Sequence, residues 1–128
     1  MSSSAKTAIF VLSDPTSESE EAFGRVFNAL SAAHDLKSRG DHVQLVFQGT
    51  GTCWPEKLVQ EDHPAHALFR QVSDVVAGAS SGCADTFGAR AGLEKCGIRL
   101  LTGNQIPGTS GLTSVTALAA EGFNILTF

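Results

Sequence analysis

Apolar residues along the chain gather in five short blocks, separated by longer and more polar segments. Several blocks are nearly continuous, which is typical of strands covered on both faces of a sheet. The segments between most blocks carry apolar residues at helical spacing. The order β-α-β-α-β-α-β-α-β predicts a mostly parallel sheet with helices on both faces and right-handed connections. The predicted strands are Ala8–Leu12, Val43–Phe47, Val75–Ala77, Ile98–Leu101 and Phe123–Leu126.

The clearest predicted helix follows the first strand. Thr16 and Ser17 are candidates to cap its start, and Ser17 together with Glu20 fits a capping box. Gly40 fits the C′ position at which such a helix ends. The apolar stripe that should face the sheet consists of Phe23, Phe27, Leu30 and Ala33, with Val26 and Leu36 beside them.

Three further helical segments are predicted. One begins near Pro55, breaks at His63–Pro64 and resumes as a short second piece. Another follows Cys83 and carries two apolar stripes, so we expect it to have two neighbours, the sheet and a second subunit. The last runs from about Ser110 to Gly122.

Length and charge narrow the classes of protein. A chain of 128 residues is expected to form one domain, residues 1–128, with a frayed serine run at 2–4. Nine basic and 13 acidic residues give a net charge of −4, so the composition does not indicate a basic surface that would bind nucleic acid or an anionic membrane. The start of the chain lacks the shape of a signal peptide, and no apolar run is long enough to span a bilayer. We therefore expect a cytoplasmic protein.

Glycine-rich and polar stretches follow the predicted strands. Ligands of open α/β sheets bind beyond the carboxyl ends of the strands, so these stretches are the candidates for a cleft. Gly49-x-Gly51 resembles part of a dinucleotide-binding fingerprint, but Trp54 stands in place of the third glycine, which excludes a Rossmann site. For Asp14, the structural alternative is a simple Asp-Pro turn. The candidate substrate-binding residues are Asp14, Gly49, Gly51, Ser80, Ser81 and Gly82.

Cys83 is the candidate catalytic residue. It follows small residues and a glycine at the predicted start of a helix, where free N–H groups and the helix dipole stabilise an anion such as a thiolate. Ser80 or Ser81 could cap that helix. The alternative interpretation is a small buried residue at a tight turn, because free cysteine is among the most buried residue types.

The other cysteines and two of the histidines favour structural roles. Cys53 lies in another strand-to-helix loop, and Cys96 lies in the last turn of a helix, where the dipole disfavours a thiolate. Three cysteines without a C-x-x-C pair argue against a disulfide framework and against a structural zinc site. His63 and His66 are expected to be ordinary loop histidines, although one imidazole could serve as a proton carrier. We expect no metal and no cofactor.

Two stretches, "LVFQGTGTCWPEKL" and "DHPAHALFRQVSDVVAGASSGCADTFGA", together with the final "EGFNILTF", resemble the DsrE/DsrF-like proteins, also called the YchN-like family. The resemblance implies a DsrEFH-like three-layer α/β/α domain with a five-stranded parallel sheet, assembled as a homo-oligomer, often a trimer or hexamer. Members with assigned roles are sulfur-relay subunits that carry a persulfide on a cysteine after the third strand, and Cys83 occupies the matching place. Ser80 stands where close look-alikes have a second cysteine.

Three functions remain open at this point. The first is a sulfur-relay-like carrier, possessing sulfurtransferase-like chemistry, that takes sulfur from a donor protein onto Cys83 and hands it to an acceptor protein. The second is a non-enzymatic, oligomeric module that binds a small ligand or a partner, with Cys83 in a structural role. The third is a redox sensor, which would need Cys53 as the resolving cysteine.

Overall fold

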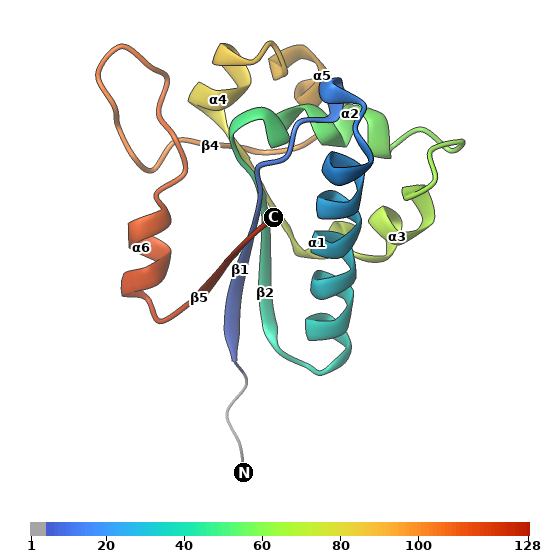
Figure 1. Cartoon of the computed structure of the whole chain (residues 1–128). Coiled ribbons are helices and arrows are strands. Elements are labelled where there is room, and N and C mark those ends of the chain that lie inside the picture. Colours follow the sequence, from blue (N-terminus) through green and yellow to red (C-terminus); the bar gives the residue numbers. More distant parts are fainter. Residues whose placement is uncertain (1–4) are drawn as a thin grey trace.

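Five parallel strands form one sheet in the order β4-β3-β2-β1-β5, in a computed structural model that describes residues 5–128 (Figure 1). The serine run at 2–4, for which we expect fraying, lies outside these residues. Helices cover both faces of the sheet, so the predicted three-layer α/β/α fold is confirmed. The strands are β1 (Lys6–Val11), β2 (His42–Phe47), β3 (Val76–Ser80), β4 (Leu100–Leu101) and β5 (Asn124–Thr127).

The inner strand β1 shows how the sheet is buried on two sides. It pairs in register with β2 on one edge, as in Ile9 opposite Leu45, and with β5 on the other. Ile9 and Val11 point into the larger core, whereas Ala8 and Phe10 point into a smaller core on the opposite face. All four are almost completely buried. This burial on both faces explains why the sequence of β1 is a nearly continuous run of apolar residues.

Most helices pack on one face of the sheet. Residues of α1 (Glu20–Ser38), α2 (Trp54–Leu58), α3 (His66–Gln71), α4 (Ser81–Thr86) and α5 (Arg90–Lys95) contribute to the larger core. On the opposite face α6 (Val115–Ala120) contributes Leu118 to the smaller core. Short 3-10 turns precede or join several helices: η1 (Pro15–Ser17), η2 (Gly49–Cys53) and η3 (Ser73–Val75).

The start of α1 differs from the prediction. Ser19, and not Thr16 or Ser17, is the N-cap, and its hydroxyl accepts a hydrogen bond from the amide of Ala22 at 3.0 Å. Ser17 belongs to η1 instead, where its hydroxyl donates to the Asp14 carbonyl. The predicted end is confirmed, because Gly40 adopts a left-handed φ of 81° that only glycine adopts without strain.

The buried face of α1 confirms the predicted stripe at Leu30 and Ala33 and departs from it at Phe27. Phe27 is 44% exposed, and its ring stacks on that of Phe23 at the margin of the core. Small residues replace the aromatic ones in the centre of the contact, which lets the helix lie close to the sheet. The residues of α1 that are buried against the sheet are Ala22, Val26, Ala29, Leu30 and Ala33.

The single helix predicted after Cys83 is in fact two short helices, α4 and α5. Gly88 separates them with a left-handed φ of 71°, and the Ala89 amide closes the end of α4 on the Ala84 carbonyl. The predicted two-striped helix is therefore wrong as a continuous element. The predicted end at Gly97 is confirmed by its left-handed φ of 73°.

Other predicted boundaries shift by a few residues. The last helix starts at Val115 rather than near Ser110, because the Ser114 hydroxyl caps it by accepting from the Ala117 amide. The long connection before it, residues 102–113, is a loop fastened by the antiparallel bridge between Asn104 and Leu112. The third strand runs on to Ser80, three residues beyond the predicted end, so that the candidate cysteine follows it directly.

Candidate functional site

The loops that follow β1, β2 and β3 lie together at one edge of the sheet. The Gln48 amide donates to the Val11 carbonyl at 3.0 Å, and the Thr50 hydroxyl donates to the Leu12 carbonyl at 2.7 Å. The turn η2 after β2 in turn packs against α4 after β3. The topology thus brings Asp14, the two glycines of η2 and the Ser80–Cys83 turn to the same edge, as the parallel sheet predicts.

The glycines of η2 are required by the backbone geometry. Gly49 adopts a left-handed φ of 57°. A Cβ at Gly51 would overlap the carbonyl oxygen of Val11, so this position allows the loop after β2 to lie directly on the end of β1. The neighbouring Gln48 is half-buried, and its Oε1 atom has no hydrogen-bond partner within residues 5–128. The close approach gives both glycines a structural role, and their binding role stays a prediction.

Asp14 uses its carboxylate within its own turn. One carboxylate oxygen accepts hydrogen bonds from the Thr16 amide at 2.8 Å and from the Thr16 hydroxyl at 2.6 Å. It also lies close enough to Cys53 to help raise the pKa of that thiol. These contacts match the structural alternative of an Asp-Pro turn, and a direct role in binding stays a prediction.

Cys83 lies in the first turn of α4, as predicted, with Ser80 as the N-cap. The Ser80 hydroxyl accepts a hydrogen bond from the Cys83 amide at 3.4 Å. Only 8% of Cys83 is exposed, which agrees with the alternative interpretation of a small buried residue at a tight turn and not with a thiol open to solvent. The expected free amides are also engaged, since the Gly82 amide donates to the Gly111 carbonyl at 2.7 Å.

The loop of residues 102–113 covers this first turn. Gly82 lacks a side chain at the contact, and a Cβ there would lie 2.6 Å from Cδ1 of Leu112 and 3.2 Å from the Gly111 carbonyl oxygen. Gly111 itself has a left-handed φ of 98° and leaves no room for a Cβ beside Thr102. A pair of glycines therefore allows the loop to close on the turn that holds Cys83.

A polar network fastens the loop to α4 and α5. The Ser81 and Ser110 hydroxyls lie 2.7 Å apart, and the Arg90 guanidinium donates to Ser81 at 2.7 Å and to Asp85 at 2.6 Å. The Ser110 hydroxyl donates to the second Asp85 oxygen at 2.8 Å. Hydrogen bonds from Arg90 and then Ser110 lower the pKa of the Asp85 carboxyl. We call Ser81, Asp85, Arg90 and Ser110 the latch network.

Sequence reasoning found only Ser81 among the four residues of the latch network. Asp85 and Arg90 are five positions apart, which is not the spacing of a helical ion pair, and a turn separates their two helices. Ser110 was assigned to the last helix. The pattern along the chain carries no signal for this cluster, because folding alone brings residues 20 and more positions apart into contact.

The other two thiols are biased toward the protonated form. Burial, followed by the negative charge of Asp14, raises the pKa of Cys53, and its Sγ donates to the Phe87 carbonyl at 3.6 Å. Burial and the nearby Glu56 raise the pKa of Cys96, in line with its predicted inertness. Both are weaker nucleophiles than an ordinary cysteine at neutral pH. All three cysteines are free thiols.

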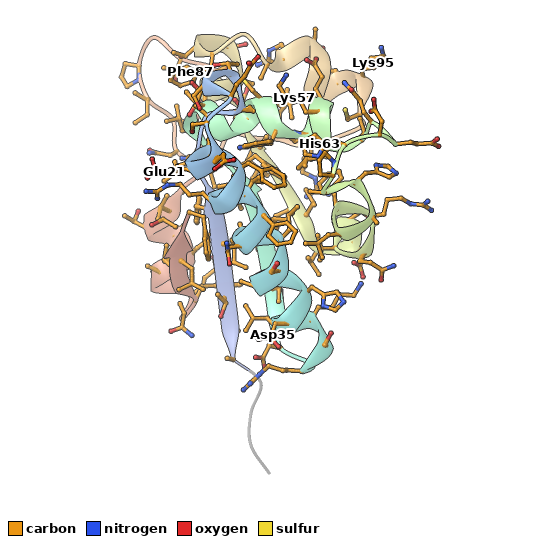
Figure 2. The ribbon with its side chains drawn as sticks, turned by 45° about the vertical axis from the view of Figure 1, so that its right-hand side comes forward. Glu21, Asp35, Lys57, His63, Phe87 and Lys95 are labelled. Atoms are coloured by element: carbon orange, nitrogen blue, oxygen red, sulfur yellow. The ribbon has the colours of Figure 1, made fainter. Side chains whose placement is uncertain are left out.

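The two histidines of the α2–α3 connection have structural contacts. His63 packs edge-on against Trp54, and its Nδ1 accepts from the Ala65 amide at 3.1 Å. His66 Nδ1 lies 2.9 Å from the Leu58 carbonyl. Figure 2 shows His63 beside α1, within the helical layer. Across residues 5–128 no group of three or more His, Cys, Asp or Glu side chains could hold a metal ion.

Comparisons with known proteins support the fold and leave the activity open. No family model matches the chain. The uncharacterized protein MJ0733 of Methanocaldococcus jannaschii is 33% identical over 49 residues, which are 38% of this chain and 40% of that protein's length. A conserved protein of unknown function from Bacteroides thetaiotaomicron, BT1422, superposes with a TM-score of 0.58 at 20% identity, covering 96% of this chain and 95% of the other. This likeness agrees with the α/β fold.

Proposed function

We propose that this protein is a sulfur-relay-like carrier, related to the DsrE/DsrF-like proteins, in which Cys83 holds sulfur as a persulfide. The Cys83 thiolate attacks the terminal sulfur of a donor persulfide, R–S–SH. The S–S bond of the donor breaks, its electron pair leaves with R–S⁻, and Cys83–S–SH forms. An acceptor thiolate then removes the terminal sulfur in the same way. No external oxidant or reductant is consumed.

The observation that supports the proposal is the place of Cys83 in a turn on which an exposed loop is fastened by a few polar contacts. Cys83 lies in the first turn of α4, at the edge where three strand-to-helix loops meet. The loop is residues 102–113, whose polar attachment to this turn is the Gly82–Gly111 hydrogen bond and the latch network. Residues 102–110 are otherwise exposed. A resting thiol is thereby shielded from wasteful oxidation, and opening of the loop releases both the sulfur and the Gly82 amide.

Persulfide loading tests the proposal directly. The protein is incubated with glutathione persulfide, digested and analysed by mass spectrometry. We expect a mass gain of one sulfur atom on Cys83 and none on Cys53 or Cys96, whose raised pKa values keep them protonated. Cys83→Ala should abolish loading while the circular dichroism spectrum stays unchanged. Loading confined to Cys53 would contradict the proposal.

Opening the cover tests the role of the loop. Gly82→Ala places a methyl group against Leu112 and should hold the loop away, so that iodoacetamide reacts with Cys83 about fivefold faster, equivalent to about 1 kcal/mol of lost loop contacts. Gly24→Ala in α1, where nothing lies within 4 Å, is the matched control. Arg90→Gln, which removes the centre of the latch network, should act in the same direction without altering α4. Unchanged rates in both variants would exclude gating by this loop.

A non-enzymatic binding module is the second candidate, and one observation favours it. Cys83 is buried and both neighbouring amides are engaged, as expected for a residue with a packing role. In that case, Cys83→Ala would bind ligands as the wild type does, and alkylation of Cys83 would require global unfolding. Alkylation in the native state, at a rate that exceeds the unfolding rate, separates the carrier from the module.

We further propose a cytoplasmic homo-oligomer, a trimer or hexamer. Three free thiols fit a reducing compartment. Phe87, between α4 and α5, is 45% exposed, and its amide donates to the Cys83 carbonyl at 2.9 Å; its position is labelled in Figure 2. No helix within residues 5–128 is long and apolar enough to cross a bilayer. Sedimentation velocity of the wild type and of Phe87→Ser tests the assembly, and a monomeric wild type would contradict it.

A further inference from the structure

A groove of about 740 Å³ lies on the face of the sheet that carries α6, and Cys83 is not among its lining residues. Its floor is apolar and includes Ala77 of β3, Leu101 of β4 and Leu118 of α6. Small residues such as Ala117 leave space above this floor. The volume is in the range of grooves that hold small molecules.

One buried polar atom on the groove has no partner. Thr113 lines the groove and is only 7% exposed, yet its Oγ1 makes no hydrogen bond within residues 5–128. A buried hydroxyl without a partner is unfavourable, and native structures contain few of them. Thr113 lines the groove, so a polar atom of a molecule bound there would give this hydroxyl a hydrogen-bond partner. It is therefore available to a bound molecule.

The charged side chains of the groove indicate the charge of that molecule. Three charged residues line it, and Asp74 is neutralised by Lys37 at 2.8 Å. The Arg99 guanidinium and the Glu121 carboxylate form no ion pair in the described part of the chain, either with each other or with a third residue. Arg99 comes from the segment that leads into β4, and Glu121 from the end of α6. Among residues 5–128, the groove thus presents the Arg99 guanidinium and the Glu121 carboxylate without an ion-pair partner, beside an apolar floor.

From these features we infer that the groove binds a zwitterionic molecule with an apolar middle, of the chemical class of a short peptide. Its carboxylate meets Arg99, its ammonium group meets Glu121, an apolar side chain covers Ala77 and Leu101, and a polar backbone atom bonds to Thr113. A peptide supplies all four groups in one chain. This site goes beyond the proposed sulfur carriage and does not depend on it.

Matched peptides test the inference. Alanyl-leucyl-alanine, its N-acetylated form and its C-amidated form are titrated at low salt into the full-length protein, and amide shifts are followed by NMR. We expect saturable shifts in residues 99–103 and 113–121. Acetylation and amidation should each weaken binding about fivefold, because each removes one exposed ion pair of about 1 kcal/mol.

Variants assign each end of the peptide. In Glu121→Gln the acetylated and free peptides should bind equally, and in Arg99→Gln the amidated and free peptides should bind equally. Thr113→Val should weaken every peptide about fivefold, the effect of one lost hydrogen bond. Thr116→Val, an exposed residue of α6 outside the groove, is the matched control and should leave affinity unchanged.

Three results would overturn the inference. These are the absence of saturable shifts with the free peptide, equal binding of all three peptides by the wild type, and concentration-dependent shifts of the groove without peptide. The last result would assign this face to a second copy of the chain. Cys83→Ala should bind the peptides as the wild type does, so failure of peptide binding and failure of sulfur loading are distinguishable.

Discussion

The two faces of the sheet are built for different tasks. On one face, five helices bury a continuous core that includes Leu30 of α1 and Phe47 of β2. On the other, α6 is the one helix within residues 5–128 that contributes to a core of five buried residues, and a groove of about 740 Å³ lies beside it. The comparison teaches that apolar burial, and with it most of the stability, is concentrated on the first face. The second face is then free to keep an open groove and an unpaired hydroxyl.

The largest expected effect is on the helix-covered face. Leu30 is completely buried between α1 and the sheet. Leu30→Ala should lower the free energy of unfolding by about 2–5 kcal/mol, because it removes apolar contacts and leaves a closed cavity. Urea denaturation followed by circular dichroism measures the change. A loss below about 1 kcal/mol would mean that this face collapses around the cavity and is less rigid than its packing indicates.

The equivalent change on the open face should cost less. Leu118 of α6 is 9% exposed, belongs to the smaller core and lines the groove. Leu118→Ala should lower the free energy of unfolding by about 1–2 kcal/mol, since transfer energy is lost but the open groove prevents a closed cavity. The same urea experiment gives the comparison with Leu30→Ala. Equal losses of unfolding free energy in Leu118→Ala and Leu30→Ala would contradict the conclusion that stability is concentrated on the helix-covered face.

Removing the unpaired hydroxyl of the open face should stabilise the fold. Thr113→Val replaces a buried oxygen without a partner by a methyl group of similar shape. The free energy of unfolding should rise by about 1 kcal/mol, while peptide binding falls as described above. A rise in the thermal midpoint together with weaker binding would mark a residue kept for function. A clear destabilisation would mean that the hydroxyl is hydrogen-bonded in solution.

The smallest effect concerns pH and the helix-covered face. Burial, and then the positive charge of Lys57 and the neighbouring His66, lower the pKa of His63, while Asp62 acts in the opposite direction. The folded state therefore binds fewer protons than the unfolded state below the ordinary histidine pKa of 6.5. The contribution of neutral His63 to the free energy of unfolding is complete above pH 6.5 and is lost as the pH falls through the lowered pKa of the folded state.

His63→Asn keeps an acceptor for the Ala65 amide and removes the titration. The free energy of unfolding of the wild type should fall between about pH 7 and pH 5, and the variant should show a flatter profile in that window. Urea denaturation at a series of pH values is the measurement. Parallel profiles would show that His63 gains its proton equally in both states.

Much of the candidate site was predictable because it follows from local patterns. Cys83 was expected in the first turn of a helix after the third strand, and it lies there. Its burial was not predictable, since Gly111 and Leu112, which pack on the neighbouring Gly82, lie almost 30 positions further along the chain. Phe27 departs from the predicted stripe for a related reason, because a helical period cannot tell which residue at the margin of an apolar face meets the sheet.

The sequence alone determined the parallel α/β architecture, the start of α4 at the candidate cysteine, and the glycine positions that end the helices. These features rest on periodicity and on backbone conformations that each residue adopts with its near neighbours. Only the tertiary structure decided the closed loop over Cys83, the latch network and the groove beside α6. Each of these joins side chains from separate elements, and their contacts depend on the packing of the whole chain rather than on any local pattern.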